Sequence, residues 1–464
     1  MKKKIKEDTQ LNKRDGFKSK WGFTLASIGS AVGMGNIWRF PVMISLWGGM
    51  SFFIPYILFV ILIASTGVIE EYTLGRLTRS GPIGAFRYAS GRKGKAKLGE
   101  RLGIIPVLGS LALAIGYTCV MGWIFKYAFM AIDGKLNYMG TNMDLIVNTF
   151  NQTASSFSNN RWIIVAGVIS LMIMSLGIAN GIERINKILM PILFFLLLGL
   201  GIYIYHQPNA INGYQYIFTI DPNKISDLKL WIFAFGQAFF SLSIAGNGSV
   251  IYGSYLPSEE DIPSAARNVA FFDTLAAMLA SLVIIPAMAV GNANLSEGGP
   301  GLMFIYLVNV FNQMHGGRII MILFYIAVLF AGISSIINLY EAPVAYLEEK
   351  FRFKRFNAAA LINIIGIIIA IFIQGIVGAW MDFVSIIIAP LGALLAGIMF
   401  FWMLDKDLAI NEVNKGRTKP LSPIFYKLGK YLYCLLSILA LILGIAFGGI
   451  GWLYKNNSTN QSSK

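Results

Sequence analysis

The sequence predicts an all-α integral membrane protein of about eleven transmembrane helices, and three features carry this prediction. Hydrophobic residues make up 56% of the 464 residues. The mean hydropathy is +0.64, and both values lie outside the range of soluble globular domains. Apolar windows that can cross about 30 Å of hydrocarbon recur along the chain, and two of them are interrupted by glycine and polar residues.

The apolar windows divide the chain into two blocks of five and one further helix. In order, they cover Trp21 to Ile44, Phe52 to Ile69, Ile104 to Ile132, Trp162 to Ile178, Ile188 to Tyr205, Leu230 to Leu256, Val269 to Val290, Ile319 to Leu339, Ala358 to Ile376, Val384 to Leu404 and Leu432 to Leu453. We therefore expect a first five-helix repeat over residues 21–206, a second over residues 230–404, and an eleventh helix with a polar tail over residues 432–464.

The formal charge of +15 comes from basic residues that are concentrated in a few segments. They gather in the N-terminal arm (residues 1–20), between the second and third windows, after the eighth window and before the eleventh. If the windows alternate in direction, all four segments lie on one side, which the positive-inside rule assigns to the cytoplasm. The N-terminus and the connection over residues 405–431 are then cytoplasmic, and the connection over residues 207–229 and the C-terminus lie outside. Because topology explains the charge, we expect no nucleic-acid partner.

The first interrupted window covers residues 25–41. It reads Leu-Ala-Ser-Ile-Gly-Ser-Ala-Val-Gly-Met-Gly-Asn-Ile-Trp-Arg-Phe-Pro. Irregular backbone is tolerated at membrane depth only where it is buried in protein or lines a cavity, and carbonyl groups released there can coordinate a dehydrated cation. This segment therefore predicts an ion and solute site.

The second interrupted window reads Ser-Leu-Ser-Ile-Ala-Gly-Asn-Gly-Ser over residues 241–249. Broken helices at corresponding positions of two inverted repeats indicate a binding site near the middle of the membrane. Close helix packing is the alternative, since small residues allow it. Packing would account for Gly29 and Gly33, but not for Asn36, Arg39 and Ser241 as well.

Two of these motifs resemble a known family. Residues 33–41 (Gly-Met-Gly-Asn-Ile-Trp-Arg-Phe-Pro) and 236–243 (Gly-Gln-Ala-Phe-Phe-Ser-Leu-Ser) are similar to motifs of the neurotransmitter:sodium symporter family, and bacterial amino-acid transporters of the leucine-transporter type resemble the chain most. The resemblance runs from about Arg14 to Leu404. It implies two inverted five-helix repeats with broken first and sixth helices, and sodium-coupled import of an amino acid by alternating access.

The resemblance also implies two sodium ions held by oxygen atoms, which are the ligands that a hard cation prefers. The first ion would use the carbonyl of Ala31, the side chains of Asn36, Ser241 and Asp273, and the substrate carboxylate. The second ion would use the carbonyls of Gly29, Val32 and Ala331 and the hydroxyls of Ser334 and Ser335. For these two serines an alternative stays open, because serine hydroxyls often bond back to the preceding helical turn.

A substrate pocket and two gates follow from the same resemblance. The implied pocket residues are Ser30, Ala31, Gly33, Met34, Gly35, Leu113, Tyr117, Phe240, Ser241, Ser243, Gly246, Ser335 and Leu339. The implied outer gate is Arg39 with Asp382 and Gln237, and the implied inner gate is Arg14 with Glu349 and Tyr255. An ordinary interfacial charge pair is the alternative for Arg39 and Asp382. The chain departs from the family pattern at Phe17, where tryptophan is usual, and over residues 46–50.

Single positions narrow the expected substrate and ions. Gly33 stands where monoamine carriers of the family have aspartate, so the carboxylate must come from the substrate, as in an amino acid. Gly246 stands where the leucine transporter has an aromatic wall, which favours a neutral, hydrophobic or aromatic side chain. Asp273 stands where many members have asparagine, and Ala277 replaces a chloride-binding serine. A fixed negative charge at Asp273 would substitute for the anion, so we expect chloride independence.

Two rival functions belong to other classes. The chain would act as a sensor or channel if it bound an amino acid without concentrative transport. A membrane enzyme would need a nucleophile, metal cluster or cofactor motif, and none was found in the sequence, so we do not expect an enzyme. The expected partners are an amino acid, sodium and the lipid bilayer of a bacterial plasma membrane.

Overall fold

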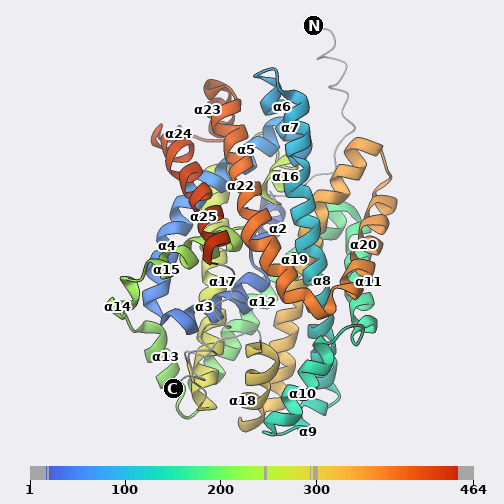
Figure 1. Cartoon of the computed structure of the whole chain (residues 1–464), viewed down its shortest axis with the longest axis vertical. Helices are drawn as coiled ribbons and strands as arrows, with labels where there is room; N and C mark the ends of the chain where they lie inside the picture. Colours follow the sequence, from blue (N-terminus) through green and yellow to red (C-terminus); the bar gives the residue numbers. More distant parts are fainter. Residues whose placement is uncertain (1–16, 18–19, 245–247, 293, 296–300, 448–464) are drawn as a thin grey trace.

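The computed structural model describes residues 17, 20–244, 248–292, 294–295 and 301–447. All regular elements within these residues are helices. Long helices run along the vertical direction of Figure 1, and shorter helices gather at the two ends, with α6, α7 and α23 at the top and α9, α10 and α18 at the bottom. This arrangement is a helical bundle with a capping layer at each end.

The elements of the first half lie within residues 20–225. They are α2 (Lys20–Ala31), the π-helical turn η1 (Gly35–Arg39), α3 (Phe40–Trp47), α4 (Met50–Ile63), η2 (Ala64–Val68), α5 (Ile69–Thr78), α6 (Pro82–Gly91), α7 (Ala96–Leu102), α8 (Ile104–Ile132), α9 (Lys135–Tyr138), α10 (Met143–Ala154), α11 (Asn160–Ser175), η3 (Ile178–Ile182), α12 (Glu183–Tyr205), α13 (Ala210–Phe218) and α14 (Pro222–Ile225).

The elements of the second half complete the bundle. They are α15 (Leu228–Ser241), α16 (Gly248–Ser254), α17 (Ile262–Val290), η4 (Leu302–Tyr306), α18 (Leu307–Gln313), α19 (Gly317–Phe351), α20 (Arg355–Phe372), η5 (Gln374–Ile376), α21 (Val377–Phe383), η6 (Val384–Ile388), α22 (Ala389–Ile398), η7 (Met399–Met403), α23 (Lys406–Asn414), α24 (Ile424–Lys427), η8 (Leu428–Tyr433) and α25 (Cys434–Phe447).

The predicted fold class is confirmed. Eight helices in the described part of the chain are long and apolar enough to cross a membrane, and Asn160–Ser175, Leu228–Ser241 and Leu302–Gln313 are shorter apolar helices. The first predicted window is divided among α2, η1 and α3, and the sixth is divided between α15 and α16. The sequence analysis did not predict the short helices in the connections, among them α10 and α13.

Local signals in the sequence place several helix ends. Asp227 precedes α15, and its side chain accepts a hydrogen bond from the Lys229 N–H at 2.9 Å. Asp261 caps α17 in the same way through the Ser264 N–H at 3.1 Å. Such side-chain acceptors satisfy N–H groups that have no partner in the first turn of a helix. The two caps fix the starts of the helices that carry Ser241 and Asp273.

Burial separates central helices from peripheral ones. In Ala96–Ile132, which comprises α7 and α8, 72% of the most apolar window is buried, whereas the corresponding figure is 28% for η3 with α12 and 22% for Ile424–Ala446. Helix α8 packs along α19, and α17 packs against α2, η1 and α3. The interrupted segment of the first window therefore lies among helices from both halves of the chain.

Glycines let α5 and α16 approach each other closely. A Cβ atom added at Gly75 would overlap the Val250 carbonyl and lie 2.8 Å from the Ser254 nitrogen. On the facing helix, a Cβ atom added at Gly253 would overlap the backbone of Tyr72. Backbone atoms cannot move aside as a flexible side chain can. This small-residue contact, typical of membrane helices, holds α16 against α5.

We expect Gly75→Ala to destabilise the fold by about 1–3 kcal/mol, because the added methyl group overpacks a backbone contact. The measurement is the midpoint of thermal unfolding in detergent. Gly199→Ala in α12 is the matched control, since a Cβ atom there meets nothing within 4 Å and alanine favours the helix. A Gly75→Ala protein as stable as the Gly199→Ala protein would contradict the close contact.

Candidate functional site

The first helix break exposes backbone groups to side chains from elsewhere in the chain. Helix α2 ends at Ala31, and the Gly33 N–H donates to Asn36 Oδ1 at 2.9 Å. The carbonyl of Ser30 accepts from Ser243 Oγ at 2.6 Å. Backbone groups that would pair within a continuous helix thus find partners on other elements, as membrane burial requires.

The second break lies at the end of α15. The helix ends at Ser241, and Ser243 adopts a left-handed conformation with φ of 55°. The chain becomes helical again at Gly248. Gly246, which was predicted as a pocket residue, lies outside the described residues. The hydrogen bond from Ser243 to Ser30 joins the two breaks.

A polar cluster forms where α17 passes the two breaks. Asn36 Nδ2 donates to Asp273 Oδ1 at 2.7 Å and to Ser241 Oγ at 3.3 Å. Ser241 Oγ in turn donates to Asp273 Oδ2 at 2.6 Å. The three side chains are at most 1% exposed, so the structure brings together the side chains predicted for the first sodium ion.

Tyr56 joins this cluster, and the sequence analysis did not find it. Its hydroxyl lies 3.2 Å from Ser241 Oγ and 3.3 Å from Asp273 Oδ2. With Asn36 and Ser241, it gives the Asp273 carboxylate three hydrogen-bond donors. No signal in the sequence marks Tyr56, because it lies in the apolar run Phe52 to Ile63 and resembles an ordinary core aromatic residue.

The residues predicted for the second sodium ion also come together, and both serine hydroxyls have hydrogen-bond partners within the helix. Ser334 Oγ donates to the Ala331 carbonyl at 2.8 Å and lies 3.4 Å from the Val32 carbonyl, and Ser335 Oγ donates to Ala331 at 2.9 Å. The hydroxyls therefore bond back to the preceding turn, as the alternative interpretation expected. Ser334 also reaches the first helix break, as the site interpretation expected. Gly29 of the predicted set packs on Asn186.

Both sets fit a hard cation. Their donors are carbonyl, hydroxyl, amide and carboxylate oxygens, which sodium prefers. No group of three or more His, Cys, Asp and Glu side chains that suits a metal ion occurs among the described residues. The donor sets therefore suit a hard cation such as sodium.

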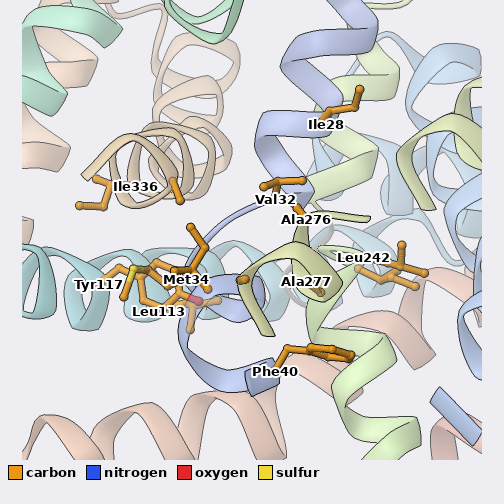
Figure 2. Close-up of a cluster of buried hydrophobic side chains, with 14 of the residues drawn as sticks. Ile28, Val32, Met34, Phe40, Leu113, Tyr117, Leu242, Ala276, Ala277 and Ile336 are labelled. Atoms are coloured by element: carbon orange, nitrogen blue, oxygen red, sulfur yellow. The ribbon is translucent and has the colours of Figure 1, made fainter. Parts of the chain in front are cut away.

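A pocket lies beside the two breaks. Its lining residues are Ser30, Ala31, Gly33, Met34, Gly35, Leu113, Tyr117, Phe240, Ser243, Gly248, Ser335, Asn338 and Leu339. Figure 2 shows Met34 next to Leu113 and Tyr117 of α8. Eleven of the thirteen lining residues were predicted from the sequence; Gly248 and Asn338 were not. The predicted residue Ser241 lies in the polar cluster instead.

Arg39 lies at one side of this pocket. Its guanidinium stacks over the Phe240 ring, 4.6 Å from the centroid. It also interacts electrostatically with Asp382 and Tyr117. The predicted gate residue Gln237 donates to the Gly35 carbonyl at 3.4 Å. Arg39 and Phe240 line a second cavity toward α22 and α25. Phe240 is thus shared between this cavity and the pocket beside the breaks.

The described residues of the predicted inner gate make several polar contacts. Glu349 accepts hydrogen bonds from Ser80 Oγ at 2.6 Å and from the Gly81 N–H at 3.0 Å. Tyr255 Oη donates to Glu341 at 2.7 Å, and Arg355 pairs with that same carboxylate at 2.6 Å. Arg14 lies outside the described residues. Phe17, which replaces the usual tryptophan, packs against Phe23, Tyr252 and Tyr255.

Comparison with known proteins explains this architecture. The family model described as the sodium:neurotransmitter symporter family matches residues 14–159 and 146–415. The chain belongs to the sodium:neurotransmitter symporter family. The resemblance seen in the two motifs is thereby confirmed.

Individual relatives support the family assignment. An uncharacterised sodium-dependent transporter of Methanocaldococcus jannaschii is 28% identical over 438 residues, which cover 87% of this chain and 84% of the relative. One of Bacillus subtilis is 28% identical over 449 residues, which cover 92% and 96%. The crystal structure of MhsT in complex with L-phenylalanine matches with a TM-score of 0.80 and 30% identity, over 93% of this chain and 99% of MhsT.

Family membership gives the general activity. The relatives are sodium-dependent transporters and not enzymes, so this family member is a multi-pass membrane protein that uses sodium. The predicted ligand sets then acquire a physical role, because sodium-dependent transport requires oxygen-lined sites within the membrane.

We expect Tyr56→Phe to weaken sodium binding about tenfold, because a hydrogen bond to a charged group contributes about 1.5–3 kcal/mol. The measurement is a titration of sodium-dependent binding on the purified protein. Tyr127→Phe is the matched control, since the Tyr127 ring is 1% exposed and its hydroxyl has no hydrogen-bond partner among the described residues. Equal sodium affinity in the Tyr56→Phe and Tyr127→Phe proteins would show that Tyr56 does not support the cluster.

Proposed function

We propose that this chain is a sodium-coupled symporter that imports a neutral, hydrophobic or aromatic amino acid by alternating access, without chloride. The proposal includes two sodium ions at the two oxygen sets, a substrate in the pocket beside the two breaks, and outer and inner gates at the two ends of the bundle. The protein would lie in a bacterial plasma membrane with its N-terminus in the cytoplasm and its C-terminus outside.

The proposal rests on one observation: the pocket and the two oxygen sets are built partly by the same residues. Ala31 and Gly33 line the pocket, while the Gly33 N–H is bonded to Asn36 of the polar cluster. Ser335 lines the pocket and bonds to the Ala331 carbonyl of the second set. A solute in the pocket would therefore lie next to both sets, so that its carboxylate can complete the shell of an ion. Such direct contact couples the two binding events.

The pocket chemistry supports a neutral amino acid. None of its lining residues carries a formal charge, and Leu113, Phe240 and Leu339 supply apolar surface. A substrate with a charged side chain would lose its hydration without gaining a partner, which costs several kcal/mol. The carboxylate and amino groups of a zwitterion would instead meet the polar groups of the two helix breaks. MhsT, which is similar in structure, holds L-phenylalanine in its crystal structure.

The charged end of the bundle supports the proposed orientation. The connection that holds α6 and α7 contains Arg87, Arg92 and Lys95. Arg92 pairs at 2.5 Å with Asp405, which begins the connection over residues 405–431. Under the positive-inside rule this end faces the cytoplasm. The inner gate proposed around Glu349 lies at the same end, because its carboxylate bonds to Ser80 and Gly81 just before α6.

We expect sodium-dependent, electrogenic and concentrative uptake of an amino acid into proteoliposomes. Each charge that crosses 100 mV releases about 2.3 kcal/mol, and each tenfold gradient about 1.4 kcal/mol. Two sodium ions then supply roughly 7 kcal/mol, which sustains an accumulation of about 10⁵-fold at equilibrium. The measurement is uptake of labelled neutral amino acids with and without an inward sodium gradient.

The same vesicles distinguish the rival function. A sensor or channel would bind the amino acid or let it equilibrate, and the internal concentration would not exceed the external one. Equal uptake in sodium and potassium media would refute sodium coupling.

We expect the parent protein to transport equally in chloride and gluconate, because the Asp273 carboxylate would supply the negative charge at this site. Asp273→Asn removes that charge, and adding Ala277→Ser supplies a hydroxyl close to it. The double variant should regain activity preferentially in chloride, whereas the Asp273→Asn variant should stay impaired. Initial rates of sodium-driven uptake in the two anions provide the measurement.

Chloride dependence of the parent protein would exclude the role proposed for Asp273. A charged carboxylate and a nearby anion repel each other strongly where the surroundings are poorly screened.

A further inference from the structure

Asn338 lines the pocket with an amide group that has no partner. The residue is 5% exposed, and neither its Oδ1 nor its Nδ2 has a hydrogen-bond partner among the described residues. Two other polar side chains of the lining have partners, since Ser243 Oγ donates to Ser30 and Ser335 Oγ donates to Ala331. An unpaired, buried amide is costly, and its position at the pocket suggests that the occupant provides the missing partner.

The position of Asn338 determines which part of a substrate it would meet. It lies one turn after Ser335 on α19 and next to Leu339, whose carbonyl accepts from Ser110 Oγ of α8 at 2.7 Å. This wall of the pocket is therefore built by α8 and α19, with Leu113 nearby. The polar backbone of the two breaks belongs to another part of the lining. If the breaks bind the α-amino and α-carboxylate groups, the α8–α19 wall receives the side chain of the substrate.

The surroundings of Asn338 on this wall are apolar. Leu113 and Leu339 share it, and both are suited to contact a hydrocarbon or aromatic ring. A single amide among such residues distinguishes substrates strongly, because a site built to hydrogen-bond a polar group rejects the analogue that lacks it. A purely apolar side chain would leave both amide atoms unpaired.

We propose that Asn338 selects neutral amino acids whose side chain combines an apolar body with one hydrogen-bonding group, such as a hydroxyl, an indole N–H or an amide. This inference rests on the proposed function, since it requires an amino acid in the pocket. It narrows the substrate class from hydrophobic or aromatic side chains to those that can pair with the amide. Asn338 acts in binding and makes no contribution to the ion sites.

The test compares matched pairs of amino acids on the purified full-length protein in sodium. Tyrosine against phenylalanine, threonine against valine, and glutamine against methionine differ mainly in one hydrogen-bonding group. Affinity is measured by the thermal stabilisation that each amino acid gives over a range of concentrations. We expect the polar member to bind at least tenfold more tightly in one or more pairs, which converts to about 1.4 kcal/mol.

Two variants assign the preference to Asn338. Asn338→Leu should bind the members of the preferred pair within about threefold of each other. Asn363→Leu is the matched control, because Asn363 is fully buried on α20 with an unpaired Oδ1 but does not line the pocket. That control should keep the preference of the parent. If Asn338→Leu does not fold, Asn338→Ala serves in its place.

Each outcome has a distinct meaning. Sodium-dependent binding with no preference in any pair of the parent overturns the inference and leaves the proposed symport intact. A preference that persists in Asn338→Leu overturns it as well, because the selecting group then lies elsewhere. If no amino acid binds the parent in sodium, the proposed function and this inference both fail.

Discussion

The structure depends on a constraint that the membrane imposes on broken helices. Two helices stop near the middle of the bundle, and the N–H and C=O groups released there have no water to pair with. Side chains must supply the partners: Asn36, three residues further along the chain, does so for the Gly33 N–H, and Ser243 of the distant second break does so for the Ser30 carbonyl. Each break is therefore stable only where such partners are packed against it.

This constraint also explains the packing around the site. Helix α17 must pass close enough to bring Asp273 to Asn36 and Ser241, so its neighbouring positions are small, including Ala276 and Ala277, both fully buried. The second half of the broken helix is held by the glycine contact between α5 and α16. Small residues give up apolar area but allow backbones to approach, which is the usual basis of helix association in membranes.

The sequence predicted features that are local in the chain, and it failed where partners are distant. The glycine and polar residues of the breaks stand out against an apolar background, so both breaks and most of the pocket were predictable. Tyr56 carries no local signal, because its role arises from contacts with Ser241 and Asp273, which are far away in the chain. Asn338 carries none either, because its place at the pocket depends on how α19 packs beside α8 and the helix breaks. The pairing of Tyr255 with Glu341 likewise depends on how α19 lies against the chain after α16. The short connecting helices lack the length that marks a transmembrane window.

The serines of the second oxygen set show why a structural and a functional interpretation need not exclude each other. Their hydroxyls bond to the Ala331 carbonyl within α19, so the helix satisfies them before any ion arrives. An incoming sodium ion would bind to the hydroxyl oxygens, which have further lone pairs, and the same carbonyl would be an additional ligand. The oxygens would therefore have partners both with and without the ion. Transport requires such reversible binding, because an ion must enter and also leave.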